Sequence, residues 1–219
     1  MKNIKTNIKK NKDTEIINNT KSIIINCAGE LIAKYGYDRV TSKSICEKAK
    51  VNIAAINYHF GSYDGLYIIV LKEVHKYLLS IEELSELYLD NLTAKEKIER
   101  FIDIFIENSL NKNNWYINVW VREIINPTPF IEQILSQEAV PKLNIVSKIF
   151  SEYTNIPSSD PMLYSCIINS ISPFMVIFLT HNTTKMIDVE KMIGIKSSRK
   201  ELISNLKKFI FIGLDGIKI

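Results

Sequence analysis

Residues 51–66, VNIAAINYHFGSYDGL, are the stretch that decides the fold. Asn52 is placed to cap a short helix, because its side-chain oxygen can accept an unpaired backbone N–H of the first turn. Ile56 and Phe60 lie four residues apart and share the inner face of that helix. Its other positions are Ile53, Ala54, Ala55, Asn57, Tyr58 and His59. Gly61 suits the residue that ends a helix, and Ser62 caps a new one. A short helix with a small, polar outer face and an apolar inner face is typical of the second helix of a DNA-binding helix-turn-helix.

The residues just before this stretch supply the first helix of such a motif. Thr41 or Ser42 can N-cap a helix over 41–48, and residues 50–52 then form the turn. In this order and spacing, the run from Gly36 to Tyr67 resembles the N-terminal domain of TetR-family transcriptional regulators. The run NIAAINYHFG and a later one at 122–143, REIINPTPFIEQILSQEAVPKL, resemble the CecR-like branch of that family.

The resemblance implies which side chains contact DNA. Family members place phosphate-contacting groups at the positions of Thr41, Asn52, Tyr58 and His59, and Ser42 belongs to the same predicted set. The positions of Ala54, Ala55 and Asn57 face base edges. Contacts to phosphates set the register on the duplex, whereas contacts to base edges read the sequence.

Three positions depart from the family pattern. Lys50 stands where the family usually has the turn glycine, which requires a lysine with positive φ. Cys46 stands at a usual alanine. Tyr63 stands where a lysine commonly reaches a backbone phosphate.

Composition argues against an all-β, turn-rich fold, and the helical spacing along the chain predicts an all-α one. The chain has 219 residues, of which 46% are hydrophobic, and only 7 Gly and 6 Pro, which indicates long regular elements. Residues 1–60 carry 11 Lys and Arg against 5 Asp and Glu, whereas residues 61–219 carry 17 against 19. The positive end coincides with the predicted helix-turn-helix, where phosphate binding needs it. Three cysteines without metal spacing and the lack of a signal peptide predict a reducing cytoplasm.

The helical pattern predicts three regions: a flexible basic arm over 1–18, a DNA-binding domain over 19–79, and a larger effector-binding and dimerisation domain over 80–219. The arm either follows DNA or is a disordered tail. In the second region, a helix over 20–35 has two apolar rows, one through Ile23 and Tyr35 and one through Ile24 and Ile32. A connecting helix over 62–79 closes that region. Further helices are predicted over 115–125, over 130–153 with a kink at Pro141, over 162–180 and over 199–214.

The segment 162–180 carries no charge, which invites a transmembrane interpretation. Its Ser, Asn and Pro residues favour a helix that is buried in a core and in a dimer interface. We therefore expect a homodimer through 161–180 and 199–214, with no membrane partner. Two copies of one short reading helix would bind a palindromic operator in double-stranded DNA.

No catalytic or metal motif is present, and the three histidines have no partner at metal spacing, so neither an enzyme nor a cofactor is predicted. One alternative is that the aromatic residues of the third region, 80–219, only pack the core. The family resemblance implies instead that they hold a small hydrophobic effector, with Arg122 or His181 as its polar anchor. The predicted effector site is Trp115, Trp120, Arg122, Phe174, Phe178 and His181. We predict a ligand-responsive regulator, most simply a repressor; the alternative is an interaction protein of the same fold without an inducer.

Overall fold

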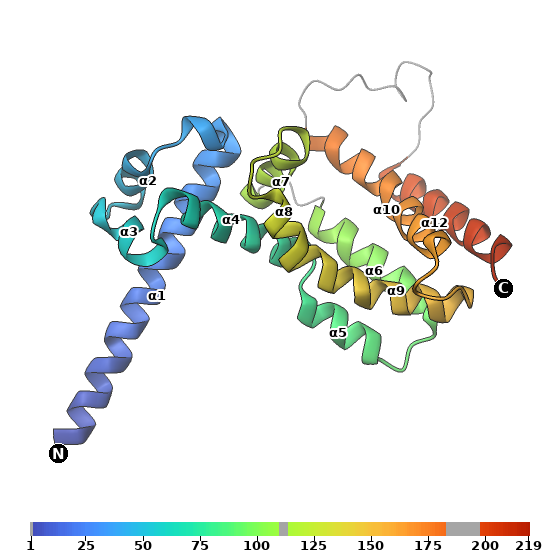
Figure 1. The fold of residues 1–219 in the computed structure, drawn as a ribbon, viewed down its shortest axis with the longest axis horizontal. Helices are drawn as coiled ribbons and strands as arrows, with labels where there is room; N and C mark the ends of the chain where they lie inside the picture. The colour runs from blue at the N-terminus through green and yellow to red at the C-terminus, as the bar shows by residue number, and fades with distance from the viewer. Residues whose placement is uncertain (1, 110–113, 183–197) are drawn as a thin grey trace. The chain divides into compact units, whose positions relative to one another are not determined.

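The computed structural model describes residues 2–109, 114–182 and 198–219; side chains at 2–18, 177–182 and 199 lie outside this description. Every regular element in these ranges is helical, as the sequence predicted (Figure 1). The chain forms two compact units. The first comprises Met1–Val74 and Trp115–Ile134, and the second comprises His75–Asn114 and Leu135–Ile219.

The first unit contains the predicted DNA-binding helices together with two later ones. Its elements are α1 (Lys2–Tyr35), a short 3-10 turn η1 (Tyr37–Arg39), α2 (Ser42–Ala49), α3 (Ala54–Phe60), most of α4 (Tyr63–Leu78), α7 (Trp115–Ile125) and α8 (Ile131–Ile134). Helix α1 contacts both α2 and α7. From the sequence, residues 115–134 were predicted to belong to the region 80–219. In the structure they belong to the first unit, which is therefore discontinuous along the chain.

Helix α1 begins at Lys2, earlier than the predicted start at Thr20. The predicted basic arm at 1–18 stays a prediction, because its side chains lie outside the described residues. Of the two predicted apolar rows, the one through Ile24 and Ile32 is buried, whereas Ile23 and Tyr35 are exposed. Burial of this row fixes which face of α1 the other helices of the unit cover.

The second unit is a helical bundle around one apolar core. Its elements are α5 (Ile81–Leu89), α6 (Ala94–Ser109), a π-helical segment (Leu135–Ala139), α9 (Val140–Thr154), α10 (Pro161–Asn182) and α12 (Arg199–Gly216). Side chains of each of these α-helices meet in the core, including Leu84, Phe101, Phe150, Phe174 and Leu214. Three of these helices start with a capping box: Ser80 with Glu83, Thr93 with Glu96, and Ser198 with Glu201. Such reciprocal bonds satisfy the first backbone N–H groups of a helix.

The single helix predicted over 130–153 is divided in the structure. α8 ends at Ile134, the π-helical segment follows, and α9 begins at Val140 with Pro141 in its first turn. Proline has no N–H and its ring crowds the carbonyl four residues earlier, so it disfavours a continuous α-helix. The wider π turn accommodates this just before the proline, whereas a simple kink was predicted.

Within the described residues, no helix is both long and apolar enough to cross a membrane.

Candidate DNA interface

The helix-turn-helix is built by local hydrogen bonds. The Thr41 hydroxyl accepts the N–H of Ser44 at 3.2 Å, and the Ser44 hydroxyl accepts the N–H of Thr41 at 3.2 Å, which starts α2. Lys50 ends it in the left-handed conformation, with φ 55° and ψ 42°. The Asn52 side chain then accepts the N–H of Ala54 at 2.9 Å and starts α3. The predicted cap at Thr41 and the positive φ of Lys50 are therefore confirmed. The Asn52 side chain accepts a backbone N–H at the start of α3 as predicted, although the N-cap residue of that helix is Ile53.

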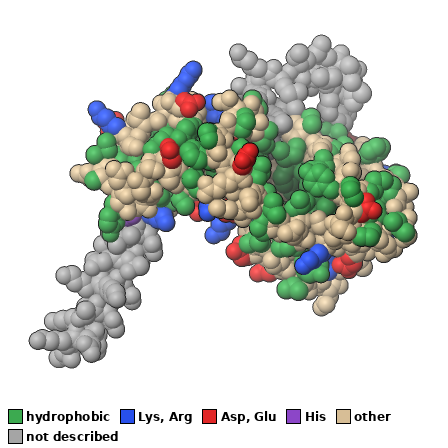
Figure 2. Space-filling model, in the orientation of Figure 1, with side chains coloured by type: hydrophobic (Ala, Val, Ile, Leu, Met, Phe, Trp, Pro, Cys, Tyr) green, Lys and Arg blue, Asp and Glu red, His purple; other side chains and the backbone are tan. Residues whose placement is uncertain are grey.

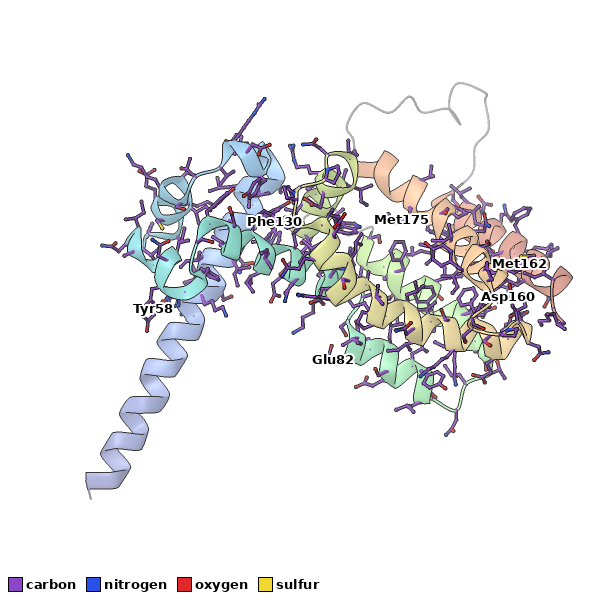
Figure 3. The ribbon with its side chains drawn as sticks, viewed as in Figure 1. Tyr58, Glu82, Phe130, Asp160, Met162 and Met175 are labelled. Atoms are coloured by element: carbon purple, nitrogen blue, oxygen red, sulfur yellow. The ribbon has the colours of Figure 1, made fainter. Side chains whose placement is uncertain are left out.

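Helix α3 turns one face inward and one outward. Ile56 is fully buried, whereas Ala54, Asn57 and Tyr58 are exposed. Figure 3 labels Tyr58 on this helix. Its side chain is 75% accessible. Gly61, with φ 78°, ends the helix, and the Ser62 hydroxyl accepts the N–H of Gly65 at 2.9 Å to start α4. The outer face is thus small at its beginning and polar further along.

The predicted DNA-contacting side chains fall into two groups by exposure. Thr41, Asn52, Ala54, Asn57 and Tyr58 are exposed, and Ser42, Ala55 and His59 are half-buried. Their assignment to phosphates or bases stays a prediction.

Ile53 was given no role by the sequence, yet 57% of it is exposed at the start of α3. Ile53 precedes the first helical turn and is the N-cap residue of α3. An apolar side chain here is chemically suited to the methyl group of thymine.

Positive charge accompanies the motif. Lys43 on α2 and Lys50 at the turn are exposed, whereas Lys48 pairs with Glu30 of α1 at 2.6 Å. Lys43 lies 4.0 Å from Glu47 with both side chains largely exposed, an ion pair that contributes little. The exposed amines therefore remain suited to phosphate binding.

The predicted effector residues on α7 pack within the first unit. The Trp115 ring stacks on Tyr116, with centroids 3.8 Å apart, and its Nε1 donates to Asn26 Oδ1 at 3.3 Å. Arg122 donates from Nε to Ala33 O at 2.8 Å and from Nη2 to Lys34 O at 2.9 Å. These are two of the carbonyls left unpaired at the end of α1, where a guanidinium is favourable.

The remaining predicted effector residues belong to both units. Trp120 is half-buried on α7, and Phe174 is buried in the core of the second unit. The side chains of Phe178 and His181 lie outside the described residues. The structure thus gives Arg122 a role in capping α1, and the predicted effector site stays a prediction.

Glu123 of α7 is a buried polar residue that bonds to α4, a pairing that was not predicted from the sequence. Only 1% of it is exposed, and its Oε2 accepts the Tyr67 hydroxyl at 2.6 Å. Its Oε1 accepts the N–H and the hydroxyl of Thr128 at 2.9 and 2.7 Å. Burial, and then the hydrogen bond to Glu123, raise the pKa of Tyr67, so its phenol stays a donor at physiological pH. A lone Glu in the apolar run of α7 was the only sequence signal.

Among the described side chains, no group of His, Cys, Asp and Glu could hold a metal ion.

An exposed, polar second helix held by a tight turn on two supporting helices is the geometry of a DNA-reading helix-turn-helix. Comparison with known families agrees. Residues 24–68 match the model of bacterial regulatory proteins of the tetR family, and residues 94–206 match the C-terminal domain of the HTH-type transcriptional dual regulator CecR. The chain belongs to the TetR family of DNA-binding transcriptional regulators and carries a CecR-type C-terminal domain.

Solved structures share the fold. HlyIIR, a hemolysin II transcriptional regulator, is 19% identical with a TM-score of 0.58, covering 88% of this chain and 97% of its own. A TetR-like regulator from Rhodococcus sp. RHA1 is 12% identical with a TM-score of 0.64, covering 90% and 96%. A transcriptional regulator from Aquifex aeolicus VF5 is 17% identical with a TM-score of 0.55, covering 90% and 99%. A search of curated protein sequences found no match.

Proposed function

We propose that the protein is a repressor that binds a palindromic operator as a homodimer and releases it when a small hydrophobic effector binds. The observation that carries the proposal is the outer face of α3, where Ala54, Asn57 and Tyr58 are exposed on a helix anchored by Ile56. A helix this short reads few base pairs, so a useful site needs two copies about 34–36 Å apart.

The surface of α10 and α12 supports the dimer. These helices contact each other, and both carry exposed apolar side chains, including Met162, Ile168, Val176, Phe209 and Ile212. Between them runs a groove of about 380 Å³ lined by residues such as Cys166, Pro173 and Gly213. Figure 2 shows hydrophobic side chains gathered over this part of the second unit. A contiguous apolar surface of this kind favours burial against a partner, here the same helices of a second copy.

The dimer is tested by sedimentation at micromolar concentration. We expect a dimer for the wild type and a monomer with weakened operator binding for Phe209→Glu, because 74% of Phe209 is exposed on α12 and the charge would lie in the interface. Leu89→Glu is the matched control, since Leu89 is 78% exposed on α5, away from these helices. A monomeric wild type, or an operator without dyad symmetry, would contradict the proposal.

The effector response needs its own experiment. A thermal-shift screen of metabolites and drugs identifies binders, and each binder is then titrated against the operator complex. We expect a largely apolar binder to weaken operator affinity by about 1–3 kcal/mol, the usual range of coupling between two sites. The alternative, an interaction protein without an inducer, gains if saturating binder leaves operator affinity unchanged.

A further inference from the structure

An aromatic contact joins the two ends of the helix-turn-helix. Tyr37 lies in η1 directly before α2, and Tyr63 is the first residue of α4, directly after α3. Their rings stack with centroids 5.1 Å apart at 23°. The Tyr63 hydroxyl donates to the backbone carbonyl of Tyr37 at 2.7 Å, and the Tyr37 hydroxyl donates to Asp64 Oδ1 at 2.6 Å. The chain between these tyrosines, which contains α2 and α3, is therefore closed at its base.

Two further rings complete this aromatic cluster, which we define as Tyr37, Tyr63, Tyr67 and Phe130. The Tyr67 ring lies 4.5 Å from that of Tyr37, and the Phe130 ring meets Tyr37 edge-on at 5.8 Å and Tyr67 at 6.1 Å. Phe130 comes from the segment that follows α7, more than sixty residues after the helix-turn-helix (Figure 3).

The segment that carries Phe130 is itself fastened to the first unit. Glu123 accepts hydrogen bonds from the Tyr67 hydroxyl of α4 and from the Thr128 hydroxyl. Arg122 donates to a carbonyl at the end of α1. Buried networks whose members are all satisfied hold one geometry. The cluster is thus supported by residues far along the chain.

The geometry points to a role for Tyr63 and its cluster in positioning the reading helix α3, in place of a direct contact between Tyr63 and a DNA phosphate. This inference rests on the DNA binding proposed above. A phenol has a single proton to donate, and the Tyr63 hydroxyl gives it to Tyr37 O. Tyr63 is also half-buried, and burial raises the pKa of its phenol, so the hydroxyl remains a neutral donor in that bond.

Positioning has a physical consequence for affinity. A site whose supporting residues are locked loses less conformational freedom on binding than one that is loosely held. Loosening the cluster therefore weakens operator binding although no cluster residue touches DNA.

The test substitutes Tyr63→Lys, Tyr63→Phe and Phe130→Leu in the full chain. The probe is a duplex that the wild type selects from a random pool. Affinity is measured at several salt concentrations, and thermal unfolding is measured in parallel. Tyr63→Lys separates the two roles, because it removes the stacked ring while adding a positive charge beside the motif. Tyr35→Lys is the matched control, since Tyr35 is an exposed ring of the same unit outside the cluster.

We expect folded Tyr63→Lys to bind the duplex at least about tenfold more weakly despite its added charge, with Phe130→Leu also weakened. Tyr63→Phe should lose about threefold to tenfold, the factor that one hydrogen bond corresponds to. If Tyr63→Lys does not fold, Tyr63→Phe decides: weakened binding supports the inference, and unchanged affinity overturns it.

Tighter binding by Tyr63→Lys with a steeper salt dependence would overturn the inference, because that is the signature of a gained phosphate contact. Lowered melting temperatures with unchanged affinity in all cluster variants would also overturn it. A wild type that selects no duplex would instead overturn the proposed function, and this inference with it.

Discussion

Replacing Gly29 by alanine tests how α1 and α7 pack in the first unit. A Cβ at Gly29 would lie 2.3 Å from two carbons of the Trp115 ring and 2.6 Å from a third. Contacts this short do not occur, so the ring must leave its stack on Tyr116 and its bond to Asn26. Overpacking costs about 1–3 kcal/mol and the aromatic pair about 0.5–1.5 kcal/mol, whereas alanine regains about 1 kcal/mol of helix propensity. We expect a net loss of about 2 kcal/mol in the free energy of unfolding.

Urea unfolding followed by circular dichroism measures this loss, and tryptophan emission reports the displaced ring. Gly216→Ala on α12 is the control, since a Cβ there meets no atom within 4 Å, and stability should change by less than about 1 kcal/mol. Adding Trp115→Leu to Gly29→Ala should recover most of the loss, because residues in contact show non-additive effects. A Gly29→Ala protein as stable as the wild type would refute the packing of Trp115 against α1.

Three further predictions concern the turn, a buried histidine and the reading helix. Lys50→Gly should raise the free energy of unfolding in urea by about 1 kcal/mol, because a residue with a Cβ is strained at φ 55°. Lys50→Ala keeps the Cβ and should give no such gain. Equal gains in stability for the two variants would disprove the strain at Lys50. Burial, and then the nearby Lys142, lower the pKa of His75 to about 4, below the 6.5 of an unfolded histidine. Between pH 4 and pH 6.5 the unfolded chain binds more protons than the folded protein, so the free energy of unfolding rises with pH. His75 accounts for about 3 kcal/mol of this rise, which is fully present above pH 6.5 and is lost as the pH falls towards 4. Urea unfolding of His75→Gln should lack this part of the pH dependence, and identical slopes for both proteins would exclude it. Asn57→Ala should cost about 1–3 kcal/mol of operator binding and relax specificity at one base pair in a selection experiment; uniform weakening across all sequences would contradict contact with a base.

Much of the local structure could be predicted from the sequence. The side-chain bonds of Thr41, Asn52 and Ser62 to the first turns of α2, α3 and α4 follow from neighbours within four residues. The bounds of α7 were also predicted correctly. The positive φ of Lys50 is implied by the family resemblance, because Lys50 stands at the position of the usual turn glycine. The all-α class and the outward face of α3 follow from apolar spacing, because a helix repeats every 3.6 residues.

What the sequence could not decide is which buried faces meet. The apolar spacing of α7 shows that this helix packs against others, but not that it packs on α1. Trp115 bonds to Asn26, 89 residues earlier in the chain, and Arg122 bonds to Lys34, 88 residues earlier. Likewise, the Tyr67 bond to Glu123 spans 56 positions. The hydrophobic effect is non-directional, so periodicity marks a face for burial without naming its partner.

The sequence by itself therefore indicated the family, through the order and spacing of its motif. It also determined the helix-turn-helix and the outward face of α3, because helix caps and apolar spacing depend only on near neighbours. Only the tertiary structure decided that residues 115–134 belong with the DNA-binding helices and that Tyr63 bonds to Tyr37. These pairings depend on the shapes of surfaces brought together from distant parts of the chain, which close packing selects and sequence spacing does not record.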